Sequence, residues 1–243
     1  MIARQPNDGP EPPAILYKYL PPDRIDILEN RRLRFSRPTD FNDTFDSDFL
    51  IPKSQGIGAK AARYHLKNQL GVLCLTAQAD NHLMWVHYAQ NHTGFILGFN
   101  SHARFFSEKD RILRKVTYQD RPNVLSNADL NVCFYKSNAW KYEREWRCVR
   151  SFQPSESRME MIEPELVSQI IFGSRMAPWQ IARIVSCLTA YGMKDAQYFI
   201  SSPSHKSWTF QNDRKEMSVC HKCAGNGYLM EDSATEDRNI RNH

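Results

Sequence analysis

The sequence contains no apolar run of the roughly 18 residues that a membrane-spanning helix requires. Its first residues, MIARQPNDGPEPPAI, lack the basic and apolar regions of a secretion signal. The excess of one sign of charge is also small, because 32 Lys and Arg residues and 27 Asp and Glu residues leave a net charge of +5. Such a mild excess does not by itself indicate a nucleic-acid partner. We therefore expect a cytoplasmic protein with no membrane partner.

Familiar catalytic signatures are missing as well. The sequence has no Walker loop, no G-x-S-x-G elbow, no H-E-x-x-H motif and no repeat at a fixed period. Its six cysteines stand mostly alone inside apolar segments, which is typical of reduced core thiols rather than of a disulfide framework. Only Cys220 and Cys223 are close together in the sequence.

The apolar segments predict an α+β fold. With 41% hydrophobic residues, a chain of 243 residues can bury one sizeable core. No glycine-rich turn joins the first strand to its helix, and several predicted strands are separated by turns only. Both features favour a mixed, mostly antiparallel sheet with packed helices in a single domain over a doubly wound sheet. Helices are expected over residues 21–32, 58–70, 81–92, 128–140 and 177–192, and strands over 15–20, 33–36, 72–77, 94–100, 112–120, 140–149, 165–174 and 196–201.

The two ends of the chain differ in composition from its middle. Residues 1–14 are rich in Pro, Asn, Asp and Gly and predict a flexible arm. From residue 213 onward the chain turns polar, which predicts a tail over 213–243. Residues 15–212 form the predicted domain.

The stretch WKYEREWRCV (residues 140–149) combines aromatic residues with four charges. Because side chains alternate across a strand, Glu143, Glu145 and Arg147 are expected on one face. That face is either an outer surface in water or the floor of a polar site. The flanking aromatic rings, which include Trp140, are costly to expose and favour the polar site. Two carboxylates there can stabilise positive charge at the anomeric carbon of a sugar or orient its hydroxyl groups.

A second group of polar residues lies in FNDTFDSDF (residues 41–49). Asn42, Asp43, Asp46 and Asp48 supply the oxygen atoms that a Mg²⁺ or Ca²⁺ site needs. The spacing lacks the later glutamate and the glycine of an EF-hand. Asn42 and Asp43 are more often turn-forming residues whose side chains bond backbone amides, and a turn beside a pocket can still contact a ligand.

The segment HLMWVHYAQNH predicts a helix capped by Asn81. At helical spacing His87 lies beside an apolar residue, where a hydrogen-bonded core histidine is more frequent than a ligand-binding one. Trp85, Tyr88 and His92 form a stripe that is either an aromatic wall for a planar ring or ordinary packing.

The segment CHKCAGNGYL places Cys220 and Cys223 at the spacing of half a zinc knuckle. A closed structural zinc site needs four ligands, and only His205 and His221 lie near in the sequence. The pair is therefore either part of a structural zinc site or two free thiols.

The order of several segments resembles a bacterial and phage-associated family of unknown function, the one numbered twenty-nine seventy-one. The resemblance covers about residues 15–200 and implies a fold and a map of residues rather than a reaction. The segments that carry it are LYKYL, LRFSRPTDFNDTFD, LMWVHYAQNHTGFILGF, VTYQD, Lys136, WKYEREWR and IIFGS.

A more distant likeness is to ADP-ribosyltransferases, which open with a strand, a helix and a strand and carry an acidic E-x-E late in the sheet. Glu143 and Glu145 resemble that acidic pair. The likeness implies NAD as the cofactor, with a glutamate that holds the nicotinamide ribose while nicotinamide departs. The first strand departs from this pattern, because Lys18 and its neighbours stand where such enzymes usually carry His or Arg. Ser36 likewise follows a phenylalanine instead of forming an S-T-S motif.

We therefore expect NAD-dependent mono-ADP-ribosyl transfer by an enzyme of a defence or toxin type that binds a nucleotide-type ligand. In this interpretation Glu145 polarises the ribose, Tyr19 or Trp85 stacks on nicotinamide, and Lys18 or Arg34 neutralises the pyrophosphate. The candidate catalytic residues are Glu145, Glu143 and Arg147, and the candidate ligand-binding residues are Tyr17, Lys18, Tyr19, Arg34, Ser36, Asn42, Asp43, Trp85, His87, Tyr88, Lys136 and Trp140.

Two other classes of function stay open. A non-catalytic accessory module could bind a partner protein or nucleic acid through basic residues such as Arg111, Arg114 and Lys115. A metal-dependent nuclease could use Asp43, Asp46 and Glu145.

Overall fold

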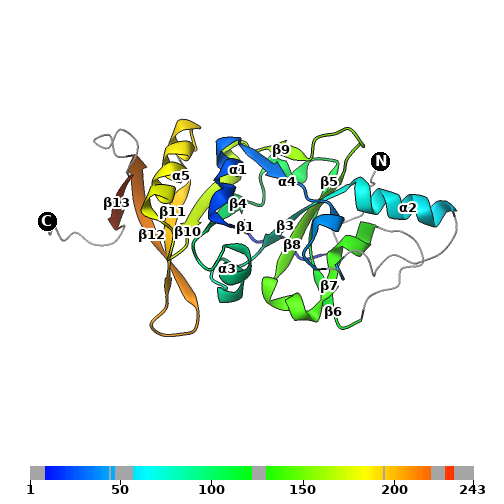
Figure 1. Ribbon diagram of the computed structural model, residues 1–243, viewed down its shortest axis with the longest axis horizontal. Coiled ribbons are helices and arrows are strands. Elements are labelled where there is room, and N and C mark those ends of the chain that lie inside the picture. Colours follow the sequence, from blue (N-terminus) through cyan, green and yellow to red (C-terminus); the bar gives the residue numbers. More distant parts are fainter. Residues whose placement is uncertain are drawn as a thin grey trace, which may run out of the picture.

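A nine-stranded sheet is the framework of the computed structural model, which describes residues 9–43, 45–46, 57–121, 130–193, 195–219 and 228–232. The strand order is β13-β12-β11-β10-β4-β1-β3-β8-β5 (Figure 1). Within this sheet β10 and β11 run parallel and the other neighbours run antiparallel, which confirms the predicted α+β class with a mostly antiparallel sheet. The strands are β1 (Ile15–Leu20), β3 (Leu70–Thr76), β4 (Phe95–Asn100), β5 (Arg111–Lys115), β8 (Glu145–Ser151), β10 (Val167–Phe172), β11 (Gln197–Pro203), β12 (Phe210–Val219) and β13 (Tyr228–Asp232).

Two short ribbons and several helices complete the fold. β2 (Arg32–Arg34) pairs with β9 (Met159–Met161), and β6 (Thr117–Gln119) pairs with β7 (Tyr135–Ser137). No helix in the described ranges is long and apolar enough to cross a membrane. The α-helices are α1 (Asp26–Glu29), α2 (Ile57–Asn68), α3 (His82–Tyr88), α4 (Arg104–Ser107) and α5 (Pro178–Ala190), and the 3-10 helices are η1 (Pro22–Ile25), η2 (Pro38–Asp40), η3 (Leu130–Phe134), η4 (Asn138–Glu143) and η5 (Pro164–Leu166).

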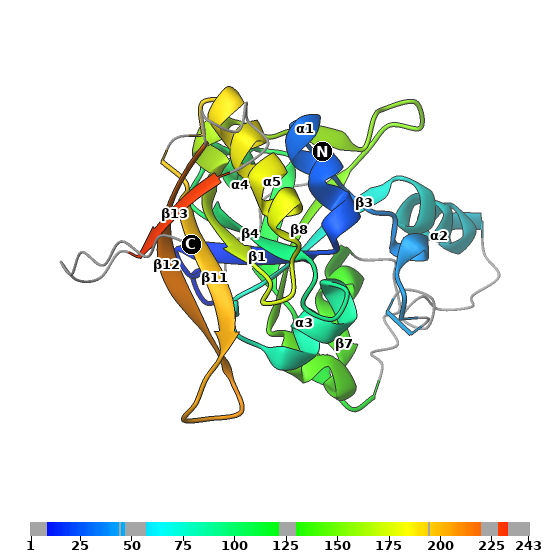
Figure 2. The ribbon, with the colours of Figure 1, turned by 60° about the vertical axis from the view of Figure 1, so that its left-hand side comes forward.

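Alternate residues of β1 enter two different cores. Leu16 and Leu20 join the larger core, to which α1 and α5 contribute. Tyr19 joins a smaller core with Trp85 of α3. Because neighbouring side chains of a strand point to opposite faces, α1 and α5 cover one face of the sheet and α3 lies on the other. Figure 2 shows α1 and α5 side by side, apart from α3.

Helix α5 follows the predicted period. Its residues Ile181, Ile184, Val185 and Leu188 are all buried, as the spacing i, i+3, i+4, i+7 requires. Each such side chain contributes roughly 1.5–3 kcal/mol of hydrophobic stabilisation when it is fully buried. Pro178 opens the helix, and Gly192 follows its end with a φ of 75°, a conformation that glycine adopts without strain.

Several predicted segments differ from the structure. The strand expected over residues 112–120 is divided into β5 and β6, which belong to different sheets. The helix expected over residues 128–140 is replaced, in its described part, by η3, β7 and the start of η4. The strand expected over residues 140–149 begins only at Glu145, because Arg144 adopts the left-handed conformation (φ 45°, ψ 48°) and breaks the extended run. From residue 213 the predicted tail continues the sheet as the second half of β12 and as β13. Backbone pairing with β11 does not depend on apolar side chains, so polar composition did not reveal this edge.

Candidate functional site

The sheet opens between β1 and β3. β1 pairs with β4 along its whole length, whereas its Cα register with β3 consists of Tyr17 and Thr76. A cavity of about 380 Å³ has walls from both of these strands and from β8, α3 and the loop after β2. It is lined by Tyr17, Lys18, Tyr19, Ser36, Asp40, Phe41, Asn42, Asp46, Val72, Cys74, Leu75, Thr76, Met84, His87, Tyr88, Lys136, Glu143 and Glu145.

Glu143 and Glu145 reach this cavity by different routes. Glu145 is the first residue of β8 and lies opposite Thr76 of β3. Glu143 ends η4, and the left-handed Arg144 turns the chain between the two acids. The Thr76 hydroxyl donates a hydrogen bond to the Glu143 carbonyl (2.5 Å), and the Glu145 amide donates one to the Tyr118 hydroxyl (2.8 Å). The backbone is therefore held at both glutamates. Strand alternation places Glu145 and Arg147 on one face of β8, as predicted, whereas Glu143 lies before the strand.

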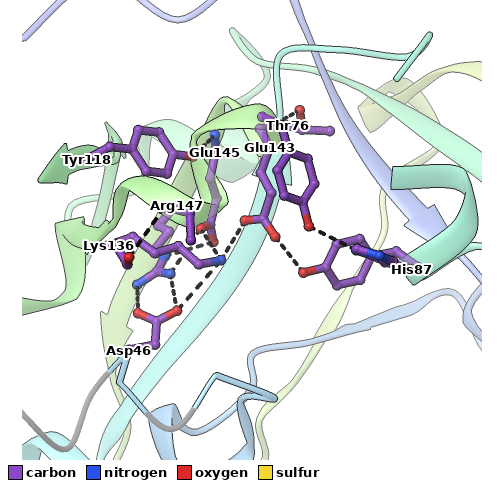
Figure 3. Close-up of polar contacts among 12 residues, drawn as sticks. Asp46, Thr76, His87, Tyr118, Lys136, Glu143, Glu145 and Arg147 are labelled. Atoms are coloured by element: carbon purple, nitrogen blue, oxygen red, sulfur yellow. Dashed lines mark hydrogen bonds and ion pairs between the residues drawn. The ribbon is translucent and has the colours of Figure 1, made fainter. Parts of the chain in front are cut away.

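The carboxylates of Glu143, Glu145 and Asp46 meet two cations in a buried ion cluster (Figure 3). Arg147 holds Asp46 in a two-pronged pair (2.7 and 2.6 Å) and donates to Glu145 through Nε (2.8 Å) and Nη2 (3.0 Å). Lys136 Nζ lies 2.5 Å from Glu143, 3.1 Å from Glu145 and 3.9 Å from Asp46. When all three acids are ionised, the cluster carries one excess negative charge.

The two glutamates have opposite pKa shifts. Burial alone would raise the pKa of Glu145, but Arg147 and Lys136 hold it at about 2. Burial raises the pKa of Glu143 above its ordinary value, against the lowering effect of Lys136. Burial would lower the pKa of Lys136, but the two glutamates raise it. At neutral pH Glu145 is therefore ionised, and Glu143 binds a proton more readily than Glu145 does.

Glu143 also has more oxygen lone pairs available than Glu145. A carboxylate can accept about four hydrogen bonds. Glu145 accepts three from Arg147 and Lys136, whereas Glu143 accepts one from Lys136 and one from the Tyr88 hydroxyl (2.5 Å). Burial raises the pKa of Tyr88, so its phenol stays a donor. Glu143 can therefore still accept hydrogen bonds from a ligand.

Helix α3 brings Tyr88 to the site and is itself fixed at its start. The Asn81 side chain accepts from the Leu83 and Met84 amides, as expected of a cap, and donates to the Tyr142 carbonyl (2.9 Å). His87 is exposed rather than a core residue, and its Nδ1 lies 2.9 Å from the Tyr142 hydroxyl. The cap therefore joins α3 to the segment that carries Glu143.

Most of the predicted ligand-binding residues lie on the cavity. Tyr17, Lys18, Tyr19, Ser36, Asn42, His87, Tyr88 and Lys136 line it together with Glu143 and Glu145. Arg147 is not among the lining residues and contacts the cavity wall through Glu145.

The structure places four predicted residues away from the cavity. Arg34 is exposed and pairs with Asp40 (2.6 Å). Asp43 accepts a hydrogen bond from the Phe45 amide (2.9 Å), as a turn-forming residue does. Trp85 is fully buried and packs edge-on against Tyr19, so it is not available to stack on a ligand. Trp140 lies beside Lys136, whose Nζ is 4.9 Å from the ring centroid, and does not line the cavity.

Sequence reasoning missed three contributors to the site. The sequence suggests Asp46 only as a metal ligand, whereas it is the bidentate partner of Arg147, 101 positions away. Thr76 and Tyr118 hold the backbone of the acidic residues from two other strands. No local sequence pattern predicts contacts between positions so far apart in the chain.

The basic residues considered for nucleic-acid binding do not form an open patch. Arg111 is buried and pairs with Glu108 and Glu160 (3.2 and 3.0 Å). Arg114 donates to Asn131 (2.6 Å). Lys115 is exposed.

The described residues contain no group of three or more His, Cys, Asp or Glu side chains that could hold a metal ion. Cys220 and Cys223 lie outside the described residues, as do residues 1–8 of the predicted arm. The zinc site therefore stays a prediction.

Comparison with known proteins gives one match. No curated protein and no solved structure matches the chain. None of the comparisons finds an ADP-ribosyltransferase, so that likeness stays a prediction. Residues 84–148, which include Tyr88, Lys136, both glutamates and Arg147, match the family described as "Protein of unknown function (DUF2971)".

Proposed function

We propose that the protein is an enzyme that binds a nucleotide-type ligand in this cavity and cleaves its glycosidic bond. Transfer of ADP-ribose from NAD is the favoured reaction. Support comes from one observation above all: Glu143 and Glu145 line one cavity and have opposite pKa shifts. Carboxyl groups whose surroundings separate their pKa values are typical of sites that divide acid–base or electrostatic roles between them.

The cavity sets a limit on what it can enclose. Its volume of about 380 Å³ is near the lower end of the range of roughly 300–1,000 Å³ common for ligand pockets. This is suitable for a ribose with one attached ring and too small for a whole dinucleotide. We expect the nicotinamide riboside half of NAD inside, with the rest of the ligand at the opening.

We assign the ligand contact to Glu143 rather than to Glu145. The oxygens of Glu145 already accept from Arg147 and Lys136, whereas Glu143 can still accept from a ribose hydroxyl. The excess negative charge of the cluster complements the positive charge that develops at an anomeric carbon as the leaving group departs. Glu145 then acts as a positioning residue, because it helps to hold Lys136 against Glu143.

The aromatic contact falls to tyrosine. Tyr17 and Tyr19 line the cavity, whereas Trp85 is buried behind Tyr19. The Tyr17 hydroxyl donates to the side chain of Gln169 on β10 (3.1 Å), so the Tyr17 ring extends across β4 and is held there. A nicotinamide ring is therefore expected to pack against Tyr17 or Tyr19.

A metal-dependent nuclease is less well supported. Asp46 and Glu145 are both paired with Arg147, and Asp43 caps a turn. A cation at these carboxylates would have to displace the guanidinium group of Arg147.

The test is NAD binding and nicotinamide release by the wild type, Glu143→Gln and Glu163→Gln, an exposed control. NAD is expected to raise the thermal midpoint of the wild type, because a ligand that binds only the native state stabilises it. Release of nicotinamide, followed by chromatography, is expected from the wild type and from Glu163→Gln. Glu143→Gln is expected to fold and to release none. The proposal would be contradicted if NAD did not stabilise the wild-type protein and the protein released no nicotinamide from NAD. Stabilisation without release would contradict the enzymatic part.

A further inference from the structure

The cavity contains two lysines with contrasting surroundings. Lys136 has three carboxylates within 3.9 Å of its Nζ. Lys18 Nζ donates to the Cys74 carbonyl (3.2 Å), and among the described residues no carboxylate oxygen lies within 4.0 Å of it. One amine is therefore fixed as a cation, and the other lacks a counter-ion in the part of the chain that the structure describes.

The opening of the sheet explains the position of Lys18. Leu16 and Leu20, two positions before and after Lys18, enter the larger core, whereas Lys18 lines the cavity between β1 and β3. Burial lowers the pKa of Lys18 and the charge of Arg24 acts in the same direction, while Cys74 and Glu145 oppose them. A lysine that is desolvated in a cavity has the surroundings of an activated amine nucleophile.

We propose that Lys18 is the nucleophilic amine of the cavity and that it forms an imine with small hydroxyaldehydes. The volume of the cavity suits a small molecule, and Glu143 offers oxygens to a hydroxyl group. Tyr17 and Tyr19 flank Lys18 on the same strand and line the same cavity. This reactivity does not depend on NAD.

The reaction balances without a further reactant. The lone pair of Lys18 Nζ attacks the carbonyl carbon, and the C–N bond forms as the carbonyl π electrons move to oxygen. The oxygen takes a proton from water, and the nitrogen loses one to water, which gives a carbinolamine. Loss of the hydroxyl group as water, with departure of the remaining N–H proton, leaves the C=N bond, so that one aldehyde and one amine yield one imine and one water.

Trapping with glycolaldehyde and cyanoborohydride tests the proposal, because reduction of the imine leaves a stable amine at the modified lysine. Peptide-resolved mass spectrometry then compares Lys18 with Lys136 and with the exposed Lys141 of the same molecule. At limiting reagent, Lys18 is expected to be modified several-fold faster than Lys141 and Lys136 slower than Lys141. Equal or slower modification of Lys18 would overturn the proposal.

Formaldehyde under the same conditions separates reactivity from ligand class. Fast methylation of Lys18 without a glycolaldehyde adduct would overturn the assignment of hydroxyaldehydes. Lys18→Arg is expected to lose the adduct at this position and to keep the labelling of Lys141. If that variant fails to fold, the comparison of the three lysines within the wild-type chain still tests the proposal. Labelling of Lys18 without nicotinamide release would overturn the NAD reaction alone.

Discussion

The two faces of the sheet differ in the side chains that are buried against them. On the face covered by α1 and α5, the core is apolar and contains residues such as Phe95, Leu97 and Ile184. On the face of α3, β8 supplies Glu145 and Arg147 to the buried ion cluster, which is completed from outside the nine-stranded sheet by Glu143, Asp46 and Lys136. Burying an ion pair often stabilises a protein no more than apolar residues of the same size would, because both ions lose their hydration. Stability alone therefore does not account for the charged face, whereas the proposed ligand chemistry gives it a role, and the following changes test that contrast.

The largest effect is expected from Arg147→Met. This change leaves Asp46 and Glu145 buried without their main partner, and breaking a buried pair in this way costs about 3–5 kcal/mol. Chemical denaturation measures the loss of unfolding free energy. Ile184→Val on the apolar face is the control, at about 0.5–1.5 kcal/mol. A smaller loss for Arg147→Met than for the control would contradict the described ion cluster.

On the apolar face, Ile184→Ala should lower stability and leave the chemistry intact. Removal of the three side-chain carbon atoms beyond Cβ from a fully buried site costs about 2–5 kcal/mol, because a cavity remains. Nicotinamide release per folded molecule and labelling of Lys18 are expected to stay at the wild-type level. Loss of either in folded protein would show that the two faces are coupled.

Acid should weaken the charged face through Glu145. Its pKa is about 2 in the folded protein and near 4.5 ordinarily, so its contribution to stability is fully present above about pH 4.5. That contribution is lost as the pH falls from about 4.5 towards 2. The raised pKa of Glu143 acts in the opposite sense, because its protonation on acidification favours the folded state. Thermal midpoints recorded against pH should show a shallower acid limb for Glu145→Gln than for the wild type, and identical limbs would be inconsistent with the ion pairs.

The smallest effect on stability is expected from Tyr88→Phe. It removes one hydrogen bond to Glu143, worth about 0.5–1.5 kcal/mol. The Glu143 carboxylate is then held by Lys136 alone among the groups bonded to it in the described chain, so nicotinamide release should fall more than stability does. Calorimetry and the release assay give the two values, and a fall in stability without a fall in release would argue against a role for Tyr88 in orienting Glu143.

Local patterns were sufficient where the structure depends on local periodicity. The spacing of Ile181 to Leu188 gave α5, and Asn81 gave the start of α3. Strand alternation placed Glu145 and Arg147 on one face. These features follow from neighbouring residues, so the sequence reveals them.

The rest of the site depends on contacts between distant parts of the chain. Glu143 joins Glu145 through a left-handed arginine, a residue that does not usually signal this conformation. The sequence alone does not tell whether Trp85 forms the wall of a ligand site or part of a core. Its burial results from packing against Ile96 and Ile171, which are distant in the sequence. The opening between β1 and β3, which makes the cavity, has no sequence pattern of its own.

Nicotinamide release by wild-type protein and by Glu143→Gln, measured at equal folded concentration with saturating NAD, tests the central claim most directly. We expect release by the wild type and none by the variant, with closely similar thermal midpoints for the two proteins. Equal release by both would show that Glu143 does not act on the ligand.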